Sequence, residues 1–300
     1  MSTLYKIRRM LLKYFLSAFL LFQYTLSVDV DLVVFNVTVL GDDGRPVTGL
    51  SASDFHVYED GREEKIKIFQ PEDTPATVGL LIDNSGSMTN KRKDVVSAAQ
   101  AFLDARHPKD EMFIVNFNRR PWLALLPSHA FTSDRAELKA TLAETRAEGT
   151  TALYDALKLA LDHLNESKRQ RKALIVLSDG GDNASTMKLD DVLRTAQQSS
   201  ATIYCIGIYD PFQKDRNPSA LKRIARVTGG EVFFPSTPDS LLTTWPRIAS
   251  AIRGQYTIGY VSSNPARDGG YRKVKITASR KRGKLLDVRT RPGYAAARNP

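Results

Sequence analysis

The sequence contains little cysteine and little histidine, and both shortages narrow the kinds of site it can hold. Its 300 residues include one cysteine, Cys205, so an internal disulfide is excluded. We expect Cys205 to be a small buried hydrophobic residue, because it lies in the apolar run 201–208. The four histidines show no metal-ligand spacing; they are His56, His107, His129 and His163.

Several catalytic motifs are also missing. No G-x-S-x-G nucleophile elbow follows a strand, as a Ser-His-Asp hydrolase requires, and there is no P-loop. The segment 84–86 lacks the second aspartate that a haloacid-dehalogenase-type phosphatase places two residues after its nucleophile. We therefore predict that the protein is not an enzyme.

The positive charge is concentrated at the two ends of the chain. The formal net charge is +10, and residues 254–300 alone carry eleven Lys and Arg against two Asp. Nucleic-acid binding is one interpretation of a basic tail. A solvated strand face is favoured here, because the tail alternates as strands do and contains no nucleic-acid motif. We predict no nucleic-acid partner.

The N-terminus has the pattern of an export signal. A basic stretch, 6–13, precedes the apolar stretch 14–22, and small residues at 25–27 offer a cleavage site before Val28. The apolar stretch is short for a transmembrane helix, which needs roughly 20 residues. Residues 1–27 are thus a signal peptide or a retained membrane anchor. In both cases the body is exported and is periplasmic, cell-surface or secreted.

Patterns of two kinds divide the rest of the chain into three segments. Residues 28–72 and 254–294 have β patterns, and neither segment is long enough to bury a face alone, so we expect them to complete one β-sandwich. Within the first, 55–61 and 65–69 predict a hairpin. Residues 75–253 alternate strand and helix patterns.

This alternation predicts an α/β fold with a doubly wound, mostly parallel sheet covered by helices on both faces. A short connection predicts one antiparallel edge strand. The expected strands are 77–83, 111–117, 122–126, 172–178, 201–208 and 231–234. The expected helices are 90–105, 134–145, 152–166, 188–199, 217–228 and 238–253.

Oxygen-bearing side chains follow two of the buried strands. Asp83 ends the run 77–83, with Ser85 and Ser87 just beyond it, and Asp179 follows the run 172–178. A third loop, 148–155, contains Thr151. Open α/β sheets bind ligands at the carboxyl ends of their strands, so we expect these groups to converge there. Carboxylates and hydroxyls suit a hard cation such as Mg²⁺.

The three-part pattern resembles the metal-ion-dependent adhesion site of von Willebrand factor type A (VWA) domains. Its parts are Asp83-x-Ser85-x-Ser87, the distant Thr151, and Asp179 after an apolar strand, and the resemblance covers roughly residues 75–250. The flanks are similar to a bacterial, acidobacterial-type "VWFA-related" subgroup.

The resemblance implies a role for each residue. Ser85 and Ser87 would coordinate Mg²⁺, or Mn²⁺ or Ca²⁺, directly, and Thr151 directly or through water. Asp83 and Asp179 would act largely through water. An acidic side chain of a protein partner would fill the remaining position. Thr150 is an alternative to Thr151, because an extra threonine follows Gly149.

Other interpretations stay open at this point. The segment 85–87 could merely turn the chain and cap the next helix, and Asp155 and Asp182 are expected to be cap or loop residues. A metal-dependent phosphoester hydrolase is an alternative function, as is a scaffold with a purely structural ion. The β-sandwich is interpreted as a pedestal rather than a second interaction surface. Partner identity and oligomeric state are left undetermined.

Overall fold

The computed structural model describes residues 32–126, 128–143, 147–209, 216–280 and 285–298. The expected leader, 1–27, lies outside these residues. In the described part of the chain, no helix has both the length and the apolar character that crossing a membrane would need.

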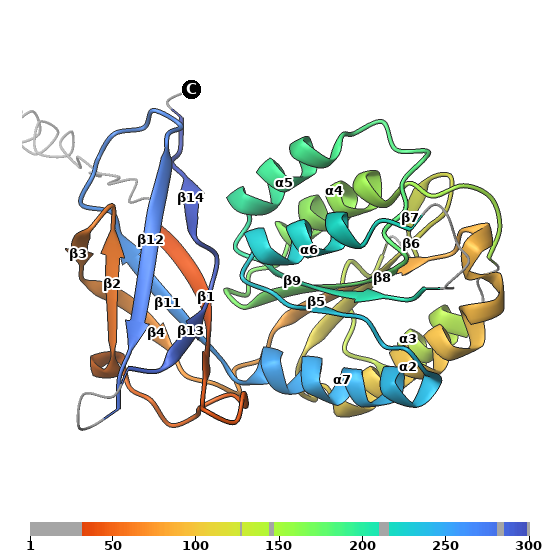
Figure 1. The fold of residues 1–300 in the computed structure, drawn as a ribbon, viewed down its shortest axis with the longest axis horizontal. Helices are drawn as coiled ribbons and strands as arrows, with labels where there is room; N and C mark the ends of the chain where they lie inside the picture. The colour runs from red at the N-terminus through yellow and green to blue at the C-terminus, as the bar shows by residue number, and fades with distance from the viewer. Residues whose placement is uncertain (1–31, 127, 144–146, 210–215, 281–284, 299–300) are drawn as a thin grey trace, which may run out of the picture. The chain divides into compact units, whose positions relative to one another are not determined.

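A six-stranded sheet forms the centre of the α/β part, in the order β10-β9-β8-β5-β6-β7 (Figure 1). Neighbouring strands are parallel except at one edge, where β7 runs antiparallel to β6. The doubly wound sheet with one antiparallel edge strand is thereby confirmed. The strands are β5 (Thr77–Asp83), β6 (Glu111–Phe117), β7 (Pro121–Leu123), β8 (Lys172–Ser178), β9 (Thr202–Gly207) and β10 (Val232–Phe233).

Helices cover both faces of this sheet (Figure 1). One face carries α2 (Arg92–Ala105), α3 (Arg135–Ala143) and α7 (Pro238–Arg253), and the short 3-10 helix η2 (Gly86–Lys91) leads into α2. The other carries α4 (Leu153–Leu164), α5 (Leu189–Gln198) and α6 (Pro218–Val227).

The inner strands are largely apolar because their side chains form a hydrophobic core on each face of the sheet. Leu80 and Ile82 of β5 belong to the core under α2, α3 and α7. Leu81, which points the other way, belongs to the core under α4, α5 and α6. Successive side chains of a strand face opposite sides of the sheet, so a strand that is covered on both sides must be apolar at every position.

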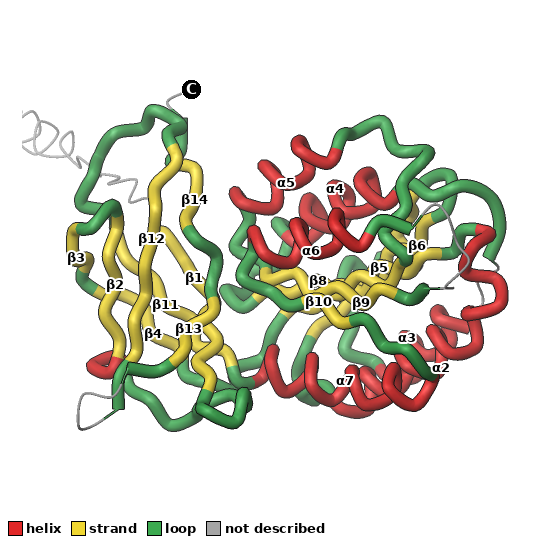
Figure 2. Tube along the Cα trace, in the orientation of Figure 1, coloured by secondary structure: helices red, strands yellow, loops and turns green. Residues whose placement is uncertain are grey.

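The two flanking segments interleave in a pair of four-stranded sheets, as predicted (Figure 2). One sheet has the order β13-β1-β11-β4 and the other β14-β12-β2-β3. The N-terminal strands are β1 (Leu32–Leu40), β2 (Phe55–Glu59), β3 (Arg62–Glu64) and β4 (Ile66–Gln70). The short 3-10 helix η1 (Ala52–Asp54) comes directly before β2. C-terminal strands are β11 (Gln255–Val261), β12 (Tyr271–Ala278), β13 (Asp287–Arg289) and β14 (Gly293–Ala295).

The hairpin predicted for 55–61 and 65–69 is only partly correct. Strand β2 does form a tight antiparallel pair, but with the three residues of β3. Strand β4 leaves for the other sheet and pairs with β11, Ile68 opposite Gly259. Its Ile66 and Phe69 pack against the core between the two sheets, so the crossing buries apolar surface that a simple hairpin would leave exposed.

Buried polar contacts join the sandwich to the amino ends of the central strands. Arg171, just before β8, donates to the carbonyls of Pro71 (2.8 Å), Thr74 (2.9 Å) and Gln255 (2.5 Å). Asn36 of β1 donates to the carbonyl of Ser200, just before β9, at 3.0 Å. The amino ends are therefore closed by the chain itself.

Candidate functional site

The first of the predicted site residues, Asp83, is the last residue of β5 and is fully buried. Its Oδ1 accepts a hydrogen bond from the Ser85 backbone N–H at 2.9 Å. Its Oδ2 accepts one from the hydroxyl of Ser178, the last residue of β8, at 2.6 Å. The carboxylate is therefore held by its own loop and by the neighbouring strand β8, and has a fixed orientation.

The two serines connect this strand end to the next. The Ser85 and Ser87 hydroxyls lie 3.0 Å apart and share a hydrogen bond, and the Ser87 hydroxyl donates to Asp179 Oδ2 at 2.7 Å. Asp179 is also buried, and its Oδ1 accepts from the Gly181 backbone N–H at 2.9 Å. The structure thus brings four of the five predicted residues into one continuous chain of hydrogen bonds.

The interpretation of these serines as helix caps does not hold. Ser85 occupies the cap position of η2, but its side chain makes no capping hydrogen bond. Both hydroxyls point instead into the chain of bonds between Asp83 and Asp179.

The fifth residue, Thr151, is placed beside the others by its loop. The Gly86 N–H donates to the Gly149 carbonyl at 3.0 Å, and the Thr151 N–H donates to Asn183 Oδ1, in the loop after β8, at 2.9 Å. Gly149 has a φ of 77°, a conformation that glycine adopts without strain. Thr151 is buried and Thr150 is half-buried. The 148–151 loop therefore lies between the two aspartate loops.

The other acids in this region serve the loops, in agreement with their interpretation as cap or loop residues. Asp182 accepts from the Tyr154 N–H at 2.9 Å. Asp155 accepts from the backbone N–H groups of Thr186 and Met187 at 2.9 and 3.0 Å.

The electrostatics of the site favour a cation. Burial raises the pKa of Asp83 to about 6, against the effect of the hydrogen bonds from Ser178 and Ser85, and nearby Asp179 adds to the rise. Within the described part of the chain, no lysine or arginine pairs with Asp83. A divalent ion between the strand ends would supply the missing compensation.

The donor set decides which ion would fit. Among the described residues, no three His, Cys, Asp or Glu side chains group in a way that could hold a metal. An ion here would therefore depend on hydroxyl oxygens as well as carboxylates. Such an all-oxygen set fits Mg²⁺, Mn²⁺ or Ca²⁺ and does not fit a soft metal.

Two residues of this region were not singled out from the sequence. Ser178 holds Asp83, and its signal is its place at the end of an apolar strand, just before Asp179. Asn84 donates from its side chain to Asn116 Oδ1 at 2.9 Å and thereby ties the first loop to β6. Its position between Asp83 and Ser85 gave no hint of this partner.

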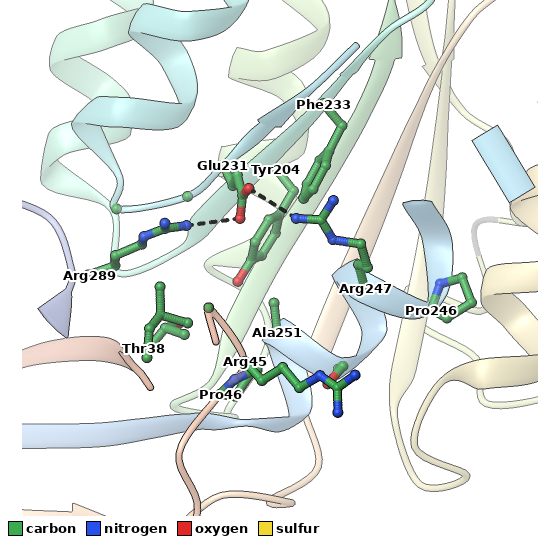
Figure 3. Close-up of a pocket in the computed structure, with 15 residues that line it drawn as sticks. Thr38, Arg45, Pro46, Tyr204, Glu231, Phe233, Pro246, Arg247, Ala251 and Arg289 are labelled. Atoms are coloured by element: carbon green, nitrogen blue, oxygen red, sulfur yellow. Dashed lines mark hydrogen bonds and ion pairs between the residues drawn. The ribbon is translucent and has the colours of Figure 1, made fainter. Parts of the chain in front are cut away.

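A separate cavity of about 430 Å³ shares no residue with the site. It is lined by the sandwich, by β9 and β10 and by α7, and Glu231 stands within it between two arginines (Figure 3). Glu231 lies 3.0 Å from Arg289 of β13 and 3.6 Å from Arg247 of α7. Because its carboxylate is already paired, we interpret the cavity as part of the contact between the sandwich and the α/β part.

Comparison with known proteins agrees with this architecture. The model of the von Willebrand factor type A domain matches residues 78–244, more than half of the chain. A von Willebrand factor type A protein from Catenulispora acidiphila superposes with a TM-score of 0.55 at 16% identity, over 89% of this chain and 74% of that one. The vWF domain of the type V pili tip protein Mfa5 from Porphyromonas gingivalis gives 0.50 at 17% identity, over 60% and 95%.

The matches to sequence relatives cover only part of each relative. An uncharacterized protein of Synechocystis is 26% identical over 180 residues, which are 58% of this chain but 41% of that protein. A protein of Borreliella burgdorferi is 29% identical over 107 residues, 31% of its length. The chain thus spans less than half of either relative. Domains of the matching type generally bind protein partners rather than catalyse reactions, and this chain belongs to the von Willebrand factor type A domain family.

Proposed function

We propose that this chain is a protein-binding module that depends on a divalent cation, with Mg²⁺ as the first choice. The ion would be held by Asp83, Ser85, Ser87, Thr151 and Asp179, and a carboxylate of a protein partner would complete its coordination. The observation that supports this most strongly is the chain of hydrogen bonds from Asp83 to the Ser85 backbone N–H and on through the Ser85 and Ser87 hydroxyls to Asp179.

The charge and the burial of these groups explain why a carboxylate of a partner would bind the ion. Serine and threonine hydroxyls are neutral, so an ion that they coordinate directly keeps most of its charge. Asp83 and Asp179 are buried and oriented by hydrogen bonds, whereas Ser87 is exposed. The inner side of the site is therefore closed by the protein, and the outer side is open to a partner.

We also propose that the module acts outside the cytoplasm, as the leader pattern at 1–27 suggests. The pilus-tip protein of Porphyromonas gingivalis carries a vWF domain with the same fold, which is consistent with a surface role. N-terminal sequencing of protein recovered from the cell envelope tests this. A start at Val28 indicates cleavage and an intact N-terminus indicates an anchor, whereas recovery in the cytoplasmic fraction alone contradicts export.

The metal site is tested by calorimetric titration of Mg²⁺ into the purified protein. Asp83→Ala should abolish Mg²⁺ binding while circular dichroism shows a folded protein. Asp190→Ala is the matched control, because Asp190 is a surface acid on α5 that pairs with Arg223 instead. Unchanged Mg²⁺ affinity in Asp83→Ala would contradict the site. If the protein still captures its partner in the presence of a chelator, the ion has only a structural role.

A further inference from the structure

One exposed loop lies directly against the candidate metal site. It is the hairpin tip 118–121 between β6 and β7, and it contacts two of the site's loops. The Asn84 N–H, next to Ser85, donates to the Phe117 carbonyl at 2.7 Å. The Ala152 N–H, next to Thr151, donates to the Asn118 carbonyl, also at 2.7 Å. The hairpin is therefore held at the rim of the site by backbone hydrogen bonds.

This hairpin presents two positive charges. Arg119 and Arg120 are both exposed, and neither forms an ion pair or side-chain hydrogen bond with any described residue. Glu148 is an exposed acid of the adjacent loop, and its backbone N–H donates to the Asn84 carbonyl at 2.8 Å. The hairpin tip itself therefore carries two positive charges and no acid.

An exposed aromatic side chain follows the arginines. Trp122 lies opposite Asn116 in the pairing of β7 with β6, and Asn116 is the residue that binds the Asn84 side chain. Its exposed fraction is 37%, and the apolar exposure continues along the edge of the sheet with Leu123 at 39% and Leu126 at 66%. Tryptophan and arginine are the residue types most enriched among side chains that dominate binding interfaces.

We propose that the hairpin and the metal form one composite surface that recognises an acidic segment of a protein partner. One carboxylate of the segment would bind the ion, a second acidic side chain would pair with Arg119 and Arg120, and an apolar side chain would pack on Trp122. This rests on the proposed function and specifies its partner: not any exposed acid, but a segment with at least two acids and an apolar residue.

The positive charge of the hairpin favours an acidic segment at this surface. Arginines without internal partners break no existing ion pair when an outside carboxylate binds them, and their planar guanidinium groups hold a carboxylate with two parallel hydrogen bonds. A segment with a single acid would leave both arginines unpaired beside the ion. The metal and the arginines can therefore be tested separately, by changing the number of acids in one probe.

The probes are three kinds of synthetic nine-residue glycine-serine peptide. The first has one aspartate, the second adds an aspartate placed in turn at each other position, and the third adds a leucine to the best of these. Binding is measured in Mg²⁺ and in chelator. In Mg²⁺ we expect the second aspartate to strengthen binding about tenfold at its best position. This gain should disappear in the double variant Arg119→Ser, Arg120→Ser, while binding of the single-aspartate peptide changes little.

The matched control is the double variant Arg62→Ser, Arg226→Ser, which has the same net charge but changes exposed arginines elsewhere. It should keep the gain. The leucine is followed by acrylamide quenching of tryptophan fluorescence. The chain has two tryptophans, and Trp245 is fully buried, so quenching reports Trp122. The leucine peptide should protect Trp122 from acrylamide, and Trp122→Phe should remove that signal.

The outcomes separate the two proposals. If both aspartate peptides bind equally in Mg²⁺, or if the gain survives in Arg119→Ser, Arg120→Ser, the hairpin is not part of the recognition surface although the metal site stands. If no peptide binds in a divalent-dependent way, the proposed function itself is contradicted. An unprotected Trp122 in the presence of the bound leucine peptide overturns the apolar contact.

Discussion

The two ends of the central sheet treat buried polar groups in opposite ways. At the amino ends of the strands, Arg171 is 1% exposed, and its guanidinium donates to three backbone carbonyls of the segments that lead into and out of the sandwich. At the carboxyl ends, Asp83 and Asp179 are equally buried, and Asp83 accepts from the Ser178 hydroxyl and the Ser85 backbone N–H, both close to the strand ends.

This difference agrees with a structural role for the amino ends of the strands and with the proposed binding role for the carboxyl ends. The polar groups at the amino ends bind distant parts of the same chain, so they fix the sandwich against the sheet. At the carboxyl ends, two buried carboxylates stand close together, and burial raises the pKa of Asp83 to about 6. An external cation beside Asp83 would favour the charged form of this carboxylate.

The largest effect should come from the amino end. Arg171→Ala removes the donor to three backbone carbonyls and leaves a cavity, and we expect the free energy of unfolding to fall by about 3 kcal/mol. Burial lowers the pKa of Arg171 to about 10, so the side chain is still charged at neutral pH and its hydrogen bonds are charge-assisted. Urea denaturation followed by circular dichroism measures the loss.

Arg223→Ala serves as its control, because that side chain is half-exposed and pairs with Asp190 on the surface. It should change stability by less than about 0.5 kcal/mol. If Arg171→Ala were no more destabilising than this control, the contrast between the two ends of the sheet would be lost.

A smaller effect, on binding rather than stability, is expected at the carboxyl end. Thr151→Val keeps the shape of the side chain but removes its hydroxyl, and should weaken Mg²⁺ binding about tenfold, or about 1.4 kcal/mol. Thr150→Val, one residue earlier and less buried, should leave Mg²⁺ affinity unchanged. Calorimetric titration of both variants decides between the threonines, and the reverse result would assign the ligand to Thr150.

Much of the fold could be predicted because its signals are local. The strands predicted at 77–83, 111–117 and 172–178 are observed with those bounds, since each is a largely apolar run that ends at a polar residue or just before one. The strand expected at 122–126 ends early, at Leu123, because an edge strand has a neighbour on one side only. The course of 62–70 was missed, because whether a short strand pairs within a hairpin or crosses between sheets depends on packing against distant residues.

The site could be predicted only in outline, for a similar reason. The order of strands and loops was enough to bring Asp83, Ser85, Ser87 and Asp179 together, but the metal itself stays a prediction. Arg171 and Arg291 show what a sequence pattern does not contain. Arg291 donates to the carbonyls of Val34 and Ser199 at 2.8 and 2.7 Å, and a backbone carbonyl gives no sign in the sequence that a side chain will reach it.

The smallest expected effect is a pH dependence of stability that arises at the amino end of the sheet. Burial disfavours the charge of Glu111, but hydrogen bonds from the Thr77 and Ser167 hydroxyls, at 2.6 and 2.7 Å, and the Arg169 charge outweigh it and lower the pKa of Glu111 below its usual value. A lowered pKa in the folded state stabilises the protein above the ordinary pKa of glutamate, and this stabilisation is lost as the pH falls through the folded-state value. Because Glu111 is partly exposed, solvent screening should keep the contribution below about 1 kcal/mol. Glu111→Gln should therefore lower stability slightly at pH 7 and flatten the acid limb of a melting-temperature profile measured from pH 7 to 3, and an unchanged profile would show that this end is held by its arginines alone.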